Sequence, residues 1–135
     1  MKDRVFIDTN VLIYAYSETE PYKKDITLTI LESYYIVFSI QVINEIIWVM
    51  NKKYKIDFKS LQALSDIFWQ KFDVTLLQKS SIDKALSIAQ RYKYSYWDSL
   101  IIASALENEC KILYTEDMQD GQIIEEKLKI ENPFK

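Results

Sequence analysis

The sequence predicts an α/β domain in which helices cover both faces of a mainly parallel sheet. Four short apolar runs alternate with longer segments that carry apolar residues at helical spacing. Strands that are separated by helices need crossover connections, and such connections favour parallel pairing. One glycine and two prolines among 135 residues leave few places for long irregular loops. We therefore expect tightly joined helices and strands.

The first strand is predicted at residues 4–7, an apolar run that is too short for a helix. The polar Asp8 and the two residues after it are typical of a strand end that passes into a helix cap. A mostly apolar helix is expected at residues 11–16 and ends before Pro21. A second helix, over residues 22–33, has apolar residues at helical spacing.

The middle of the chain repeats this alternation. Residues 34–38 are aromatic and β-branched, which favours a strand, and Ser39 is a good N-cap for an apolar-periodic helix over residues 40–53. Asp57 can cap a further helix over residues 58–72.

A third strand, at residues 73–77, is followed by two helices whose starts resemble capping boxes. Each start has a serine with an acid three residues later, although glutamate is the more usual acid at that position. The pairs are Ser80 with Asp83 and Ser95 with Asp98, and the helices are expected at residues 81–92 and 97–108.

The last part of the chain contains a strand, a polar turn and an edge strand. The strand is predicted at residues 111–114, the turn at 115–121 and the edge strand at 128–130. In open parallel sheets, ligands bind outside the carboxyl ends of the strands. Asp8 and Asp117 both follow such ends, so we expect them at a ligand-binding edge.

Composition indicates one soluble domain, residues 1–135, with a substantial core. Hydrophobic residues make up 49% of the chain, yet no apolar run approaches the roughly 20 residues that span a bilayer. A lone cysteine and the absence of a recognisable secretory signal predict a cytoplasmic protein. With no histidine to activate it, Cys110 is expected to be a small buried residue and not a nucleophile. One glycine excludes a dinucleotide fingerprint and a P-loop.

Four acids interrupt or follow hydrophobic segments, namely Asp8, Glu45, Asp98 and Asp117. Each has a structural explanation of its own: Asp8 can cap a helix, Glu45 can lie on a solvated helix face, and Asp98 can complete a capping box. Asp117 and the nearby Asp120 can hydrogen-bond their own loop backbone. Together the four can converge on one edge of the sheet, where unpaired carboxylates would repel one another.

A divalent cation is the simplest partner for such a cluster. The chain has no histidine, and zinc would be expected to recruit histidine or cysteine, whereas oxygen ligands suit Mg²⁺ or Mn²⁺. Asp98 lies near a helix N-terminus and is expected to stay ionised easily.

The net charge of −3 and the pI near 5.0 argue against broad, nonspecific binding of nucleic acid, so any such contact must be local. Two groups of basic residues are candidates for phosphate contacts, with a merely solvated surface as the alternative for both. They are Lys52, Lys53 and Lys55, and Arg91 with Lys93. Some of the ten tyrosines are candidates for stacking on single-stranded RNA or for a dimer interface, although packing explains most of them.

Four blocks of sequence, in order along nearly the whole chain, resemble PIN domains. The blocks are residues 8–12 (DTNVL), 39–45 (SIQVINE), 96–105 (YWDSLIIASA) and 113–121 (LYTEDMQDG). The ending at residues 130–134 (IENPF) also resembles the VapC-type toxin branch of that family. Four blocks in sequence are far more specific than a lone Asp-Thr-Asn.

The resemblance implies a three-layer α/β/α fold and a metal-dependent endoribonuclease, commonly the toxin of a type II toxin–antitoxin pair. The family's acidic quartet, which is catalytic and binds Mg²⁺ with Mn²⁺ as a substitute, matches Asp8, Glu45, Asp98 and Asp117. Asn10 and Thr115 match polar residues that support that pocket, and Asp120 is an additional candidate at a place that is often another polar residue in relatives. The family's usual assembly implies an RNA substrate, a homodimer and a small antitoxin that covers the site.

Two other interpretations stay open at the level of sequence. A catalytically silent PIN-like module could bind RNA or a partner protein without cleaving anything. A nuclease of this kind could also act on DNA, or in RNA processing rather than in toxicity. Cleavage that requires a divalent cation distinguishes the enzyme from the silent module.

Overall fold

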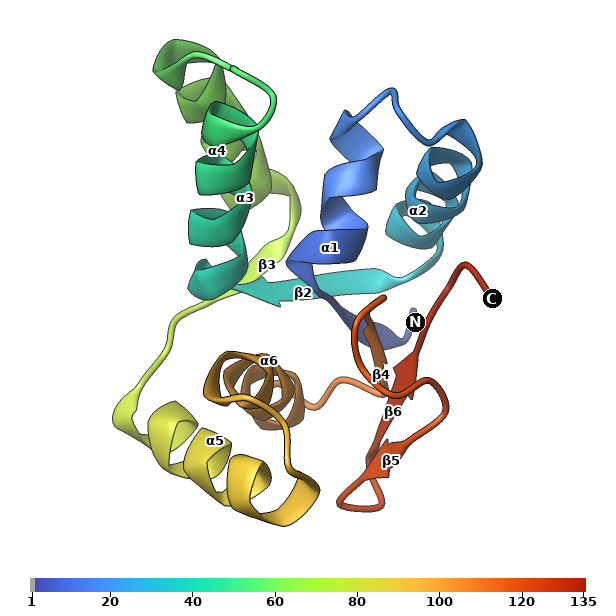
Figure 1. The fold of residues 1–135 in the computed structure, drawn as a ribbon, viewed down its shortest axis with the longest axis vertical. Coiled ribbons are helices and arrows are strands. Elements are labelled where there is room, and N and C mark those ends of the chain that lie inside the picture. Colours follow the sequence, from blue (N-terminus) through green and yellow to red (C-terminus); the bar gives the residue numbers. More distant parts are fainter. Residues whose placement is uncertain (1) are drawn as a thin grey trace.

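A computed structural model describes residues 2–135, in which six α-helices and one short 3-10 helix surround a six-stranded sheet (Figure 1). In chain order the elements are β1 (Arg4–Ile7), α1 (Thr9–Leu12), the 3-10 helix η1 (Ile13–Tyr16), α2 (Pro21–Ser33), β2 (Tyr35–Ser39), α3 (Ile40–Lys52), α4 (Phe58–Lys71), β3 (Asp73–Thr75), α5 (Lys79–Tyr92), α6 (Tyr96–Glu107), β4 (Ile112–Tyr114), β5 (Ile123–Ile124) and β6 (Leu128–Glu131).

The sheet has the strand order β3-β2-β1-β4-β6-β5, and only the β5–β6 pair is antiparallel. The chain first moves outward from β1 through β2 to β3 and then returns to place β4 on the other side of β1. Crossover connections between parallel strands are right-handed. The helices of connections that run in opposite directions along the sheet therefore cover opposite faces of it. Figure 1 shows α1 to α4 above β2 and α5 with α6 below it. The predicted fold class, an α/β/α arrangement with a mainly parallel sheet, is confirmed.

The core forms where both faces of the central strands are covered. Val5, Phe6 and Ile7 of β1 are fully buried, as expected for a strand between two helical layers. In α6, the run of residues 99–105 is buried all round, because this helix packs against β2 and β4 as well as α5. Cys110 is also buried, as predicted, and burial raises the pKa of its thiol to about 12.

One prediction about the C-terminal part was wrong, and one strand was not predicted. The segment at residues 128–130 belongs to β6, which lies inside the sheet between β4 and β5 and is not its edge. The edge on that side is β5, a two-residue strand that is too short to give a recognisable pattern. The two strands are joined by a tight turn at Glu125 and Glu126, both with positive φ.

Most predicted helix starts are confirmed, and two differ in their capping. Asp57 accepts a hydrogen bond from the Ser60 backbone N–H at 2.7 Å, as an N-cap should. Helix α5 begins at Lys79 through a capping box between Gln78 and Ser81, not between Ser80 and Asp83. Ser39 does precede α3, but its buried hydroxyl makes no side-chain capping bond.

Candidate active site

The four predicted acids line one cleft of about 780 Å³ at the carboxyl ends of the parallel strands. Asp8 follows β1, Glu45 lies in the second turn of α3, Asp98 in the first turn of α6, and Asp117 in the loop after β4. The strand order reverses between β1 and β4, which is where open α/β sheets bind ligands. The topology therefore brings together four side chains that are up to 109 residues apart in the sequence.

Asp8 is the buried member of the group, with 6% of its surface exposed. Its Oδ1 accepts a hydrogen bond from the Thr9 backbone N–H at 2.7 Å, and its Oδ2 accepts one from Thr115 Oγ1 at 3.0 Å. The pKa of Asp8 is nevertheless raised to about 7, chiefly by burial and also by the negative charges of Glu45 and Asp98, which together outweigh the two hydrogen bonds. The carboxylate thus lacks a positive partner in a place where it needs one.

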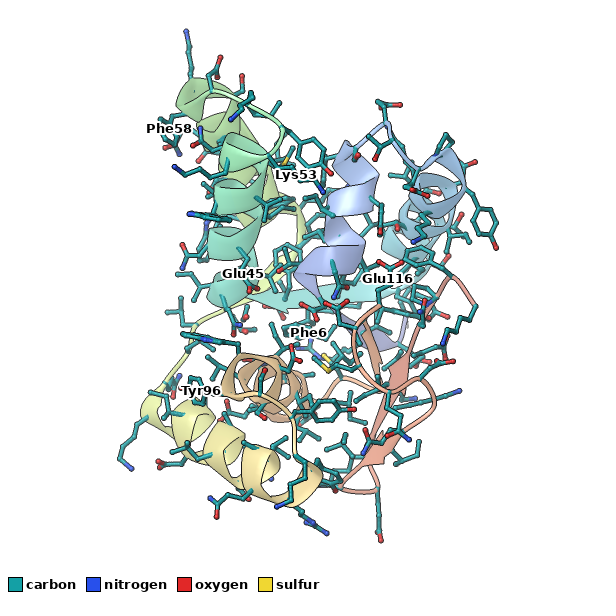
Figure 2. The ribbon with its side chains drawn as sticks, viewed as in Figure 1. Phe6, Glu45, Lys53, Phe58, Tyr96 and Glu116 are labelled. Carbon is teal, nitrogen blue, oxygen red and sulfur yellow. The ribbon has the colours of Figure 1, made fainter. Side chains whose placement is uncertain are left out.

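Glu45 is exposed, which agrees with the alternative explanation of this acid as a surface residue. It nevertheless lines the cleft. Its Oε1 accepts a hydrogen bond from Thr9 Oγ1 at 2.8 Å. Thr9 therefore joins Asp8 to Glu45, with its backbone N–H on one carboxylate and its hydroxyl on the other. In Figure 2, Glu45 lies at the end of α3 that is nearer to α6.

Asp98 occupies the third position of α6, where Ser95 Oγ accepts a hydrogen bond from its backbone N–H at 3.1 Å. The cap predicted at Ser95 is confirmed. The expectation that the helix N-terminus keeps Asp98 easily ionised is not, because partial burial and the negative charge of Asp117 raise the pKa of Asp98. Asp98 therefore lies close enough to Asp117 for their like charges to interact.

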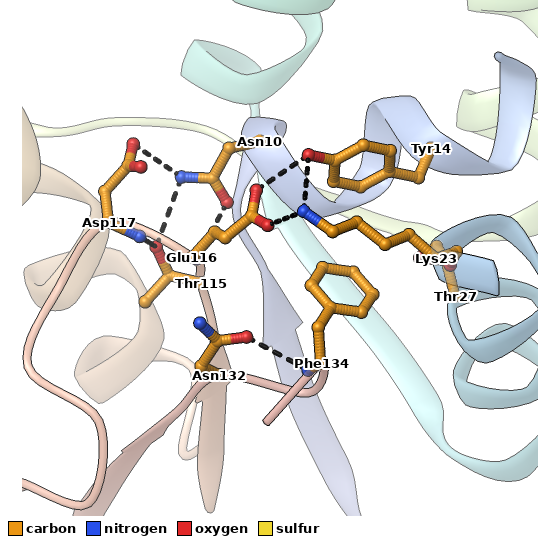
Figure 3. A network of polar contacts seen from close by, with 9 residues as sticks. All are labelled: Asn10, Tyr14, Lys23, Thr27, Thr115, Glu116, Asp117, Asn132 and Phe134. Atoms are coloured by element: carbon orange, nitrogen blue, oxygen red, sulfur yellow. Dashed lines mark hydrogen bonds and ion pairs between the residues drawn. The ribbon is translucent and has the colours of Figure 1, made fainter. Parts of the chain in front are cut away.

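Asn10 and Thr115 hold the loop that carries Asp117 (Figure 3). Asn10 Nδ2 donates to Asp117 Oδ2 at 2.8 Å and to Thr115 Oγ1 at 3.3 Å. Asn10 Oδ1 accepts from the Glu116 backbone N–H at 3.1 Å. The support predicted for these two polar residues is therefore visible as direct contacts with the acids.

Glu116 also lines the cleft, and sequence reasoning did not single it out. Unlike the four acids, it has a cationic partner, since Lys23 of α2 forms an ion pair with it (Figure 3). Tyr14 donates its hydroxyl hydrogen to Glu116 Oε1 at 2.8 Å, and the Phe134 ring packs edge-on against Tyr14 with 5.3 Å between centroids. The sequence offered one signal, the position of Glu116 between Thr115 and Asp117. The sequence alone does not reveal its contacts with Lys23 and Tyr14.

The structure separates Asp120 from the cleft. Its Oδ1 accepts a hydrogen bond from the Asn132 backbone N–H at 2.8 Å, and it is not among the lining residues. Of the basic candidates, Lys53 lines the cleft, whereas Arg91 and Lys93 do not.

The donor set fits a hard divalent cation in chemistry. Within residues 2–135, none of the four acids forms an ion pair with a basic side chain, although every ion pair found there engages another acid. Carboxylate oxygens beside a water-accessible cleft are the ligands that Mg²⁺ prefers. The same described residues contain no group of three or more potential ligands already gathered around one point.

Fold and site together define an α/β domain with an acidic cleft at the switch point of its sheet. The PIN domain family model matches residues 5–119, so the chain belongs to the PIN domain family. This confirms the family resemblance found in the sequence. A comparison with curated proteins gave no significant match.

Solved structures show the same fold. A toxin–antitoxin complex from Klebsiella pneumoniae is similar with a TM-score of 0.70 and 23% identity, over 96% of this chain and 97% of that one. VapC20 of Mycobacterium tuberculosis, a sarcin-ricin loop cleaving toxin, has a TM-score of 0.68 and 16% identity, over 84% and 89%. VapBC2 from Rickettsia felis, bound to a promoter DNA fragment, has a TM-score of 0.68 and 16% identity, over 96% and 99%. In residues 2–135, no helix is both long and apolar enough to cross a lipid bilayer.

Proposed function

We propose that this PIN domain is a metal-dependent endoribonuclease that hydrolyses RNA phosphodiester bonds and acts as the toxin of a type II toxin–antitoxin pair. One observation carries the proposal. Four carboxylates from four separate elements line a single cleft, and none has a basic partner within residues 2–135. Such an arrangement is destabilising unless a cation joins it.

Asp8 and Asp98 are the best candidates for direct metal ligands, with Glu45 and Asp117 holding a second ion or orienting a water molecule. When bound, Mg²⁺, or Mn²⁺ in its place, lowers the pKa of a coordinated water and neutralises charge that develops on the phosphate. Thr115 and the Thr9 N–H fix the orientation of Asp8, and Asn10 fixes that of Asp117.

The assignment as a toxin is supported by the names of structurally similar proteins, which include a toxin–antitoxin complex and a sarcin-ricin loop cleaving toxin. On this basis we propose a small antitoxin that covers the cleft, a homodimer as the assembly and the cytoplasm as the site of action. Expression of the chain alone should arrest growth, and Asp8→Asn should relieve the arrest. Equal arrest by both would contradict catalysis as its cause.

Purified protein should cleave RNA only when Mg²⁺ or Mn²⁺ is present, with products mapped by their ends. Asp8→Asn and Asp98→Asn should each reduce cleavage at least about 100-fold, since each removes a ligand charge. Asp120→Asn is the matched control, because its carboxylate lies outside the cleft. Undiminished cleavage by both site variants, checked for folding by circular dichroism, would refute the site.

The catalytically silent module is the alternative, and one observation favours it: within residues 2–135 the acids are not gathered tightly enough to form a ready ligand group. A silent module would bind RNA or a partner equally well after metal removal and would cleave nothing under any divalent ion. Calorimetric titration with Mn²⁺ separates the two, because the enzyme requires a binding site that Asp8→Asn weakens.

A further inference from the structure

Two exposed tryptophans lie on the cleft that holds the four acids. Trp48 of α3 is 64% exposed and Trp97 of α6 is 63% exposed, and both belong to the cleft lining. Single exposed apolar residues need no explanation, but two large rings beside one cleft form a patch that is suited to a partner. The helices that carry them also carry Glu45 and Asp98, so the rings flank the proposed reaction centre.

The cleft has little positive charge with which to hold a nucleic acid. Among its lining residues within the described chain, Lys53 is the only basic side chain. Six acids line the same cleft, namely Asp8, Glu20, Glu45, Asp98, Glu116 and Asp117. Electrostatic attraction usually dominates the affinity of proteins for nucleic acids. Here, beyond Lys53 and a bound cation, affinity has to come from uncharged contacts, and aromatic rings are the strongest of these.

Helix α3 arranges these contacts in a line. Gln41, Glu45 and Trp48 recur at helical spacing along the side of α3 that borders the cleft, and Lys53 follows at its C-terminal end. At about 1.5 Å of rise per residue, Trp48 lies roughly 5 Å beyond Glu45 along the axis and Lys53 roughly 8 Å beyond Trp48. In Figure 2, Lys53 lies at the end of this helix away from α6, and Glu45 lies nearer to α6. A base that stacks on Trp48 therefore belongs to a nucleotide next to the acids.

Gln41 joins the two walls and leaves one acceptor free. Its Nε2 donates to the Trp97 backbone carbonyl at 3.3 Å, which ties α3 to the first turn of α6. The side chain is only 7% exposed, and its Oε1 has no hydrogen-bond partner within residues 2–135. Gln41 therefore links the two helices that carry the exposed tryptophans.

We propose that Trp48 and Trp97 stack on unpaired bases of the substrate while Lys53 contacts its phosphate backbone. Stacking of this kind requires unpaired bases, because bases within a duplex already stack on one another and do not present their faces. This inference rests on the proposed nuclease function and adds the side chains of this chain that would hold the RNA beside the acids.

Binding is tested with the full chain carrying Asp98→Asn, which is expected to keep the RNA intact, in buffer with Mg²⁺. The anisotropy of a short dye-labelled single-stranded RNA of mixed sequence reports the affinity. Trp48→Ala or Trp97→Ala should weaken binding about 5- to 100-fold, the usual cost of losing one stacked base, and Trp48→Phe should lose much less. Trp69→Ala is the matched control, since Trp69 of α4 is 46% exposed but lies outside the cleft.

The role of Lys53 is tested by the dependence of binding on salt. Lys53→Gln should lower the slope of log K against log salt concentration by about 0.7, the value for one lost phosphate contact on a single strand. Lys59 of α4 is exposed and lies outside the cleft, so Lys59→Gln should leave the slope unchanged.

Wild-type affinity in both tryptophan-to-alanine variants would overturn the inference, and so would equal binding of a duplex of the same sequence. A Trp48→Ala protein that binds RNA normally but changes its sedimentation coefficient would assign the ring to a contact between protein chains, which also overturns it. Binding that depends on Trp48 without cleavage under any divalent ion supports the inference and refutes the nuclease. Cleavage by Trp48→Ala with an unchanged KM supports the nuclease and refutes the inference.

Discussion

Asp8 is both a helix cap and a member of the acidic cleft, two roles that the sequence analysis treated as alternatives. It ends β1 and caps α1 through the Thr9 N–H, and it is also the most deeply buried acid of the cleft. A capping carboxylate normally stays exposed and ionised, whereas burial raises the pKa of this one to about 7. The residue is therefore held in a place where its negative charge is costly without a positively charged partner.

The metal-free protein should lose stability as pH rises because of Asp8. The unfolded chain releases this proton near pH 4 and the folded chain near pH 7, so the folded state binds more protons in between. The free energy of unfolding should then fall by up to about 1.4 kcal/mol per pH unit across that window. In urea unfolding with EDTA, the free energy of unfolding of Asp8→Asn should increase relative to that of the wild type from pH 4 to 7. Saturating Mg²⁺ should abolish the gain, and a constant difference across this range would contradict the assignment.

Thr115 should act through Asp8 and not through packing. Thr115→Val removes the 3.0 Å hydrogen bond to Asp8 Oδ2 and conserves the shape, so the affinity for Mn²⁺ should fall about 10- to 100-fold in calorimetric titration. Thr75→Val is a matched control, because the buried Thr75 hydroxyl of β3 has no partner within residues 2–135. Equal loss in both variants would indicate a general structural effect.

The residues of the site were predictable to the extent that they interrupt hydrophobic patterns. Asp8, Glu45, Asp98 and Asp117 do so and share the cleft. Glu116 and Trp48 do not, since a glutamate in a polar loop and a tryptophan on a helix look ordinary in one dimension. Their importance depends on which face the fold turns toward the cleft, and Asp120, a plausible loop acid, faces elsewhere.

At the scale of elements, the scarcity of glycine leaves other residues in strained backbone conformations. Left-handed backbone conformations that glycine usually takes are occupied by five other residues, namely Lys55, Lys93, Glu109, Glu125 and Glu126. The last two form the turn of the β5–β6 hairpin, in which Lys127 N–H donates to the Ile124 carbonyl at 3.0 Å. Such a turn needs positive φ at both central residues and strongly favours Asn-Gly.

Glu126→Gly should stabilise the protein by about 1 kcal/mol, because glycine adopts φ of +61° without the steric penalty of a side chain. Thermal unfolding monitored by circular dichroism measures the gain. Glu126→Ala removes the same charge but keeps the penalty, so it should give no comparable increase. The neighbouring Glu125 is unsuitable for this test because its carboxylate pairs with Lys84.

Helices and strands were predictable where length and periodicity agree. The strand at residues 4–7 has a clear apolar pattern, the helix after Asp57 has both a pattern and a cap, and both elements are confirmed. Strand β5 was missed because two residues cannot show alternation, and β6 was placed at the edge because its partner β5 was unseen. The box at Gln78 was missed since glutamine is not a usual capping residue.

At the scale of the whole molecule, an ion pair joins α2 to the loop after β4. Lys23 and Glu116 are each about a quarter exposed, and the rings of Tyr14 and Phe134 cover the lysine. The pair therefore joins an early helix, a late loop and the segment around residue 134 beside the cleft (Figure 3).

Lys23→Met should destabilise the protein by about 1–2 kcal/mol, since it leaves Glu116 without its cation while preserving most of the apolar stem. Adding Glu116→Gln should recover most of the loss, because the amide oxygen still accepts from Tyr14. Urea unfolding of the two single variants and the double variant completes the cycle. Additive losses would show that the two side chains do not interact.

The order of the strands has a consequence for the timing of activity. Asp8 emerges early in synthesis, but its neighbour β4, its partner Thr115 and Asp117 belong to the last quarter of these 135 residues. Until that segment leaves the ribosome, β1 is an open edge and the cleft lacks one wall. On the proposed nuclease function, a nascent chain that still lacks this segment should not cleave RNA, because the cleft is not yet assembled.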